Sequence, residues 1–193
     1  MMGDVKAVMR TKNTARPRRA MAGTLAAGML GMALISGCSG VSADEAAVID
    51  GRSIGESQLQ DTVEELNSIS AQPATPSTVL SQLALTPIVD GIMAGTSAEL
   101  TDQQVVDVLE QNGLSNPSSL TIDVGRTILY SAALQDPAQL SNPDVAEALS
   151  QLQEVTGEDI AAVVQDVNPR YGSFDAETRT IVPRVPEWIT PAG

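Results

Sequence analysis

The chain contains no histidine, one cysteine and only four aromatic residues among its 193 residues. Without histidine, it cannot build a Ser-His-Asp triad, a Cys-His dyad or a zinc site with histidine ligands. The single cysteine, Cys38, cannot form a disulfide within the chain. Because aromatic rings are so few, the core must be built mostly from leucine, valine, isoleucine and alanine. These absences exclude several classes of enzyme and cofactor site.

Lysine is missing from most of the chain as well. The residues before Cys38 carry six basic side chains and one acid, a net charge of +5, whereas residues 38–193 carry five arginines, no lysine and 23 acids, a net charge of −18. Affinity for nucleic acid comes largely from lysine and arginine that displace counterions from phosphates. We therefore expect no nucleic-acid partner, and adsorption of the acidic part to an anionic lipid surface is disfavoured.

The first 37 residues have the three zones of a secretory signal peptide. A basic zone ends at Arg18-Arg19, and an uncharged apolar run follows from Ala20 to Ile35. As a helix this run would span roughly 24 Å, which is short of the ~30 Å hydrocarbon core of a bilayer. The arginine pair leaves the twin-arginine export route open as an alternative to the general secretory route.

The end of this segment resembles the lipobox of bacterial lipoproteins. An aliphatic residue and small residues precede the cysteine, in the order Leu34, Ile35, Ser36, Gly37, Cys38. In that family the cysteine sulfur receives a diacylglyceryl group and the chain is cut just before it, and two acyl chains anchor stably where one is marginal. The resemblance implies a signal peptide over 1–37, a lipidated Cys38 with a tether over 38–45, and a location on the extracytoplasmic face of the cell membrane.

Residues 46–193 have the pattern of one mainly α-helical domain with a small β element. The apolar run at 46–49, stopped by Asp50-Gly51, predicts a strand and a turn. The spacing of apolar residues predicts five helices, over 56–68, 78–93, 101–112, 116–135 and 143–156. Thr101 and Gln104 form a capping box, and Gly113 is a suitable stop after that helix.

Prolines and one apolar stripe give further detail. Asn116-Pro117 and Asn142-Pro143 each place proline at the expected first position of a helix. Pro87 is expected to kink the second helix or to split it, because it removes a backbone donor and crowds the preceding turn. In the 116–135 helix the expected inward stripe is Leu120, Val124, Ile128 and Ala132.

The last part of the chain has a different pattern. Residues 161–167 are rich in β-branched side chains, residues 168–172 indicate a bend, and a C-terminal hairpin is expected with its turn near 175–179. We therefore expect a β element formed by the N-terminal strand and this hairpin. Pro183 and Pro186 place the residues that follow at an edge of the sheet or outside it.

Two segments resemble the SurA N-terminal-domain family of envelope chaperones, which includes SurA, PrsA-like foldases and trigger-factor relatives. The first is Ala46–Ile54 with the acidic helix after it, and the second is Val167–Asp175 with Val182-Pro183 and Trp188-Ile189. The resemblance is to short actinobacterial lipoproteins of that group. It implies that the N-terminal strand pairs with C-terminal strands and that the domain binds non-native polypeptides. The parvulin isomerase domain of the longer members is missing, and its paired histidines cannot be supplied here.

The candidate site residues are aromatic side chains, not carboxylates. The acids of the predicted helices, among them Glu64-Glu65, Asp102, Asp107 and Glu158-Asp159, are expected on solvent-facing surfaces, with no metal and no cofactor. Tyr171, Phe174 and Trp188 are candidates for binding client chains. For Tyr171 and Phe174 the alternative is that they close the core over the hairpin.

Taken together, these features predict a protein without catalytic activity. We expect a membrane-anchored, extracytoplasmic chaperone-like lipoprotein that binds unfolded or secreted polypeptides in a groove between helices. The alternative is a non-enzymatic envelope adaptor that binds one specific partner protein. A small-ligand-binding or enzymatic lipoprotein would need a closed pocket with convergent polar groups, and no motif indicates one.

Overall fold

The computed structural model of the chain describes residue 42 and residues 44–184. The helices are α1 (Glu56–Ile69), α2 (Pro76–Met93), α3 (Asp102–Gln111), α4 (Ser119–Gln135), α5 (Pro143–Glu154) and α6 (Gly157–Val163), with a short 3-10 turn at Gln139–Ser141. The strands are β1 (Glu45–Ile49), β2 (Arg52–Gly55), β3 (Val164–Val167), β4 (Ser173–Asp175) and β5 (Thr180–Val182). This confirms the mainly α-helical fold with a small β element.

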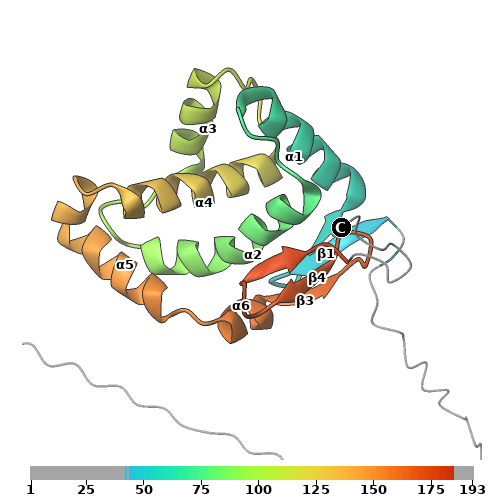
Figure 1. Ribbon diagram of the computed structural model, residues 1–193. Helices are drawn as coiled ribbons and strands as arrows, with labels where there is room; N and C mark the ends of the chain where they lie inside the picture. The colour runs from blue at the N-terminus through green and yellow to red at the C-terminus, as the bar shows by residue number, and fades with distance from the viewer. Residues whose placement is uncertain (1–41, 43, 185–193) are drawn as a thin grey trace, which may run out of the picture. The chain divides into compact units, whose positions relative to one another are not determined.

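The strands form two small antiparallel sheets. In the first, β1 lies between β2 and β3, with Ala47 opposite Val167 in the β1–β3 pair. N-terminal and C-terminal segments therefore lie side by side, as the blue and red strands in Figure 1 show. The expected hairpin is present as β4–β5, but it forms a sheet of its own. The C-terminal strand that pairs with β1 is β3, which precedes the hairpin.

Local capping residues set most helix ends. Thr101 Oγ1 accepts a hydrogen bond from the N–H of Gln104 at 3.3 Å, while Gln104 Oε1 accepts one from the N–H of Thr101 at 2.9 Å. This is the predicted capping box of α3. Asn142 caps α5, with Pro143 as its first residue, also as predicted. These ends could be predicted because each depends on residues within one turn.

Three helices differ from the prediction. Helix α2 is continuous through Pro87, so of the two expected outcomes, a kink or a split, the split does not occur. Helix α6 (Gly157–Val163) was not predicted, and it includes the first part of the β-branched segment 161–167. Helix α4 starts at Ser119, with Ser118 as its cap, and not at Pro117. Ser118 Oγ accepts from the N–H of Thr121, and Ser118 also donates its own N–H to Glu65 of α1 at 3.0 Å. The later start is therefore fixed in part by a residue of another helix.

The inward face of α4 is also different. Leu120 and Val124 are buried, but Ile128 is 46% exposed and Ala132 is exposed. Because a helix has 3.6 residues per turn, a stripe with strict four-residue spacing drifts by about 40° at each step. The buried side instead continues through Thr127, Tyr130 and Leu134. Ile128 is thereby turned out of the core.

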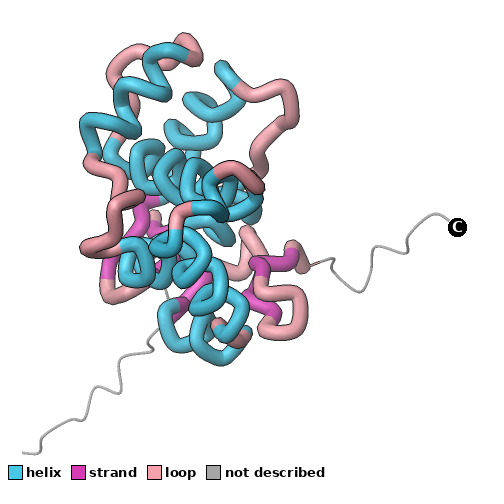
Figure 2. The backbone as a smooth tube through the Cα atoms, turned by 90° about the vertical axis from the view of Figure 1, so that its left-hand side faces the viewer, coloured by secondary structure: helices cyan, strands magenta, loops and turns pink. Residues whose placement is uncertain are grey.

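The helices α2 and α4 form the centre of the domain. They lie side by side in Figure 1, and Figure 2 shows the strands in the lower half of the described domain, below the upper helices. One buried cluster joins α1, α2, the start of α4 and the strands, a second joins the far ends of α2 and α4 to α5, and a third lies between α3 and α4. Every packing layer of the domain thus includes α2 or α4.

Candidate functional site

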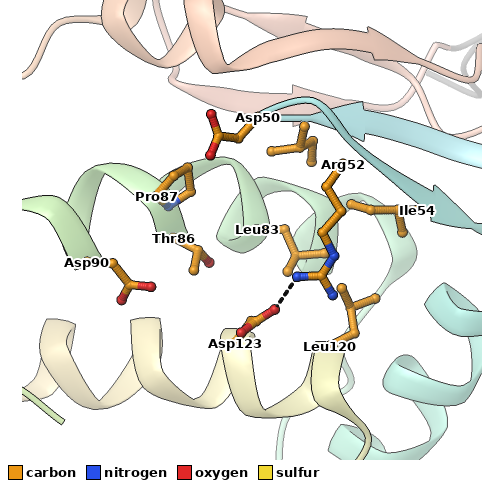
Figure 3. A pocket seen from close by; sticks show the side chains of 10 residues that line it. Asp50, Arg52, Ile54, Leu83, Thr86, Pro87, Asp90, Leu120 and Asp123 are labelled. Carbon is orange, nitrogen blue, oxygen red and sulfur yellow. Dashed lines mark hydrogen bonds and ion pairs between the residues drawn. The ribbon is translucent and has the colours of Figure 1, made fainter. Parts of the chain in front are cut away.

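Among the depressions that border α4 are two that we call the cleft and the groove. The cleft lies between the β1–β2 turn, α2 and α4 and has a volume of about 360 Å³. Its walls combine apolar side chains from all three elements with four charged ones (Figure 3). The charged residues are Asp50, Arg52, Asp90 and Asp123.

The charges of the cleft are largely paired with one another. Arg52 reaches from β2 to α4, and its Nη1 lies 2.6 Å from Asp123 Oδ2 (Figure 3). Half of the Arg52 side chain is exposed, whereas Asp123 is only 20% exposed. This ion pair fixes the hairpin turn against α4 across the mouth of the cleft.

Arg126 forms the centre of a second charged cluster next to the cleft. Its Nη1 lies 3.2 Å from Asp90 Oδ2 and 3.5 Å from Asp123 Oδ1, and its Nη2 pairs with Asp102. The side chain is only 11% exposed. One guanidinium therefore links α2, α3 and α4, which suits its planar set of five donors.

The environment shifts the pKa values of this cluster. Burial raises the pKa of Asp90 above its usual value, and the Arg126 guanidinium opposes that shift only in part. Burial works against the charge of Arg126, but the carboxylates of Asp90, Asp102 and Asp123 raise its pKa. Burial also raises the pKa of Tyr130, whose hydroxyl accepts a hydrogen bond from the N–H of Leu100 at 2.8 Å.

This arrangement holds helices together and does not resemble a catalytic pair. Asp90 and Asp123 both face the same arginine, so neither is positioned as an acid opposite a base. Among the described residues, 42 and 44–184, there is no group of three or more acidic or cysteine side chains that could hold a metal ion. The cleft could accommodate a positively charged group beside Asp50 or Asp90, whereas Arg52 and Asp123 already compensate each other.

The groove has different chemistry. It lies between α1, α3 and α4, has a volume of about 280 Å³, and is lined mainly by aliphatic side chains. Its aliphatic lining residues include Leu66, Ile69, Val108, Leu109, Ile128 and Leu129. Ile128 and Val182 are the large hydrophobic residues that stand out as exposed in the described part of the chain, at 46% and 40%. Of these two, only Ile128 lines the groove.

Gly125 determines how closely α3 approaches α4 at the base of the groove. A Cβ atom at Gly125 would lie 3.2 Å from Val105 Cγ1 and 3.4 Å from Leu109 Cδ1. A glycine in a helix interior is unfavourable by roughly 1 kcal/mol relative to alanine, so its presence indicates a packing requirement. Sequence reasoning did not find the groove, although this glycine and the drift of the α4 stripe are both visible in the sequence.

The carboxylates considered from the sequence have structural roles. Glu65 accepts hydrogen bonds from Ser118 and Thr121 at the start of α4. Asp102 belongs to the Arg126 cluster. Asp159 caps α6 with Thr156, and hydrogen bonds from Thr156 lower the pKa of that carboxyl.

The structure places the candidate aromatic residues in two ways. Tyr171 is buried at 8% exposure in the cluster that joins α1, α2 and the strands, and Phe174 is half-buried against the same cluster. They close the core over the hairpin, which is the alternative left open for them by the sequence. Trp188 lies outside the described residues, as do Cys38 and the lipobox residues 34–37.

No helix among the described residues is both long enough and apolar enough to cross a membrane. No protein-family model, curated protein or solved structure matches the chain.

Proposed function

We propose that this protein is a non-catalytic, polypeptide-binding lipoprotein of the cell envelope, anchored through Cys38 on the extracytoplasmic face of the membrane, which binds apolar segments of secreted chains as a chaperone does. The observation that carries the proposal is the groove, an apolar depression with Ile128 exposed at its edge. Burying one aliphatic side chain is worth about 1.5–3 kcal/mol, so a client side chain can bind there without nucleotide or metal. The lipobox and the resemblance to the SurA N-terminal-domain family support the same proposal.

The size of the groove favours a second candidate, an adaptor for one specific partner protein. A volume of about 280 Å³ lies at the lower end of the roughly 300–1,000 Å³ that binding pockets span. It accommodates a few side chains and not a long segment. A chaperone would use this groove weakly with many clients, whereas an adaptor would use it tightly with one.

The first experiment measures light scattering from a chemically unfolded client after dilution, with and without residues 39–193 of this protein. The test variant is Ile128→Gln, and its matched control is Val182→Gln, which removes the exposed hydrophobic residue that lies outside the groove. The two side chains are exposed to a similar extent, 46% and 40%, so the two changes should alter the free energy of unfolding by similar amounts, about 1 kcal/mol or less. A Trp188→Ala variant reports separately on the C-terminal tail.

Suppression of aggregation by the wild type and by Val182→Gln, but not by Ile128→Gln, would support the chaperone. If no client is protected, the adaptor predicts that crosslinking from the groove recovers one dominant membrane protein, and that Ile128→Gln loses it. If neither result is obtained, the groove is not a polypeptide-binding site and the proposal is wrong.

A further inference from the structure

The charge of the described residues is unevenly distributed between helices and strands. Residues 56–163, from α1 to α6, carry 16 acids and one arginine, a net charge of −15. The strands lie in the rest of the described chain, which is residue 42, residues 44–55 and residues 164–184. This part carries six acids and four arginines, a net charge of −2. The groove lies wholly within the strongly negative part.

The walls of the groove have the same imbalance. Helices α1 and α3 carry seven acids and no basic residue, and α4 adds Asp123 and Arg126. The charge of Arg126 is compensated by three aspartates, and its side chain is only 11% exposed. Among the acids of α1, Glu56 pairs with Arg170 at the end of the helix away from the groove. No residue that lines the groove is charged, so the acids of α1 and α3 act on it through the negative potential that surrounds it.

We propose that the groove selects apolar segments that are flanked by lysine or arginine. This inference rests on the proposed function, since it specifies the polypeptide that the groove binds. The apolar centre of the segment enters the groove, while its flanking cations remain in solvent close to the acids of α1 and α3. A segment flanked by acids would meet like charge on two walls, and complementary potentials of this kind raise both specificity and association rate.

The test uses short fluorescent peptides that share one apolar centre and differ only in their flanks, which are lysine, serine or glutamate. Binding to the mature chain is followed by fluorescence anisotropy at low and at high salt. The Debye length falls from about 30 Å at 0.01 M to about 3 Å at 1 M, so an electrostatic preference must shrink across this range. We expect the lysine-flanked peptide to bind about tenfold or more tightly than the glutamate-flanked one at low salt, with little difference at high salt.

Two charge-removal variants locate the effect. The test variant neutralises four exposed acids of α1 and α3, the two acidic helices that border the groove, and combines Asp61→Asn, Glu64→Gln, Asp107→Asn and Glu110→Gln. The control variant removes the same number of charges from exposed positions in α5 and α6 and in the segment before them. It combines Asp136→Asn, Glu147→Gln, Glu154→Gln and Glu158→Gln. Both variants change the net charge of the chain equally, so only the position of the acids differs. The test variant should lose most of the preference for lysine flanks, and the control should keep it.

The outcomes separate this inference from the proposed function. Equal binding of all three peptides, or equal loss of preference in both variants, overturns the selection for cationic flanks while leaving apolar binding intact. Absence of binding by every peptide, including the serine-flanked one, means that the groove does not bind polypeptides and that the proposed function fails.

Discussion

The cleft and the groove border the same helix, α4, but they use its side chains in opposite ways. On the cleft side, Asp123 and Arg126 pair with charged residues of β2, α2 and α3. On the groove side, Gly125 and Ile128 offer no polar group, and Ile128 remains 46% exposed. The cleft has the larger volume, yet three of its four charged residues, Arg52, Asp90 and Asp123, already take part in ion pairs within the protein. The groove has apolar surface that remains uncovered.

This difference indicates that volume alone is a poor guide to the binding site. A ligand in the cleft would have to displace or compete with existing ion pairs, whereas a ligand in the groove would only remove apolar surface from water. We therefore expect substitution of the paired charges around the cleft to change stability without changing binding. Substitution of the exposed apolar surface of the groove should change binding, and a change in packing at its base should alter both binding and stability. Four substitutions test this contrast, given from the largest expected effect on stability to the smallest.

Gly125→Val should have the largest effect, because it acts on packing at the base of the groove. Its first added atom would meet Val105 and Leu109 at 3.2 and 3.4 Å, and the branched side chain extends further into α3. Overpacking of this kind costs about 1–3 kcal/mol, and we expect the upper end together with loss of peptide binding. Denaturant unfolding measures the cost. The control is Gly91→Val in α2, where an added Cβ meets nothing within 4 Å and stability should hardly change. Equal losses in both variants would show that the α3–α4 contact is not the cause.

Arg126→Gln should destabilise the fold by about 2 kcal/mol, because it removes the common partner of three aspartates, two of which, Asp90 and Asp123, are partly buried. Arg52→Gln is the comparison, since its ion pair with Asp123 is half exposed and should contribute less than about 1 kcal/mol. The unfolding midpoints of the two variants show how much stability each one loses. If both cost the same, burial does not set the strength of these pairs. Neither variant should weaken peptide binding in the groove beyond its effect on folding.

Thr127→Val tests the buried link between the two central helices. The Thr86 and Thr127 hydroxyls lie 2.8 Å apart, and each also lies within hydrogen-bond distance of a carbonyl one turn earlier in its own helix. Because a hydroxyl has one proton, one of the two donates to its carbonyl and accepts from the other. Removing one hydroxyl should cost about 1 kcal/mol, because the other loses a partner in a dry environment. The double variant Thr86→Val with Thr127→Val should cost less than twice the single change. A fully additive double variant would mean that the two hydroxyls do not interact.

Asp90→Asn should have the smallest effect and the opposite sign. Because burial raises the pKa of Asp90, the folded state disfavours its ionised form relative to the unfolded chain. At pH 7 the neutral asparagine should therefore stabilise the fold slightly, by less than about 1 kcal/mol, since the side chain is 37% exposed to screening solvent. The gain should disappear below the ordinary pKa of 3.8, where aspartic acid is protonated in both states. A loss of stability at pH 7 would show that the Arg126 pair outweighs desolvation.

Sequence reasoning succeeded where the information is local. The capping box of Thr101 and Gln104, the start of α5 at Asn142-Pro143 and the β4–β5 hairpin were all predicted, because each depends on neighbouring residues. The start of α4 was missed by two residues, since its cap Ser118 also bonds to Glu65 in another helix. The sequence predicted that β1 pairs with a strand from the C-terminal part of the chain, but it did not identify that strand as β3.

The candidate sites were harder to predict than the elements. From the sequence, Tyr171 and Phe174 could either bind client chains or close the core. Their packing against α1, α2 and the strands decided between these alternatives. The groove was not found at all, because no single segment contains it. Its floor and walls come from Leu66, Val108 and Leu129, which lie on three different helices.

The sequence by itself determined the strong negative charge of residues 38–193, the absence of histidine chemistry, the order of the five longer helices, and most of their ends. These properties depend on composition or on contacts within one turn. Only the tertiary structure decided that Ile128 is turned outward, that one arginine joins three helices, and that apolar surface is left uncovered between α1, α3 and α4. The physical reason is that each of these depends on how surfaces distant in the chain pack together, which local propensity and periodicity do not specify.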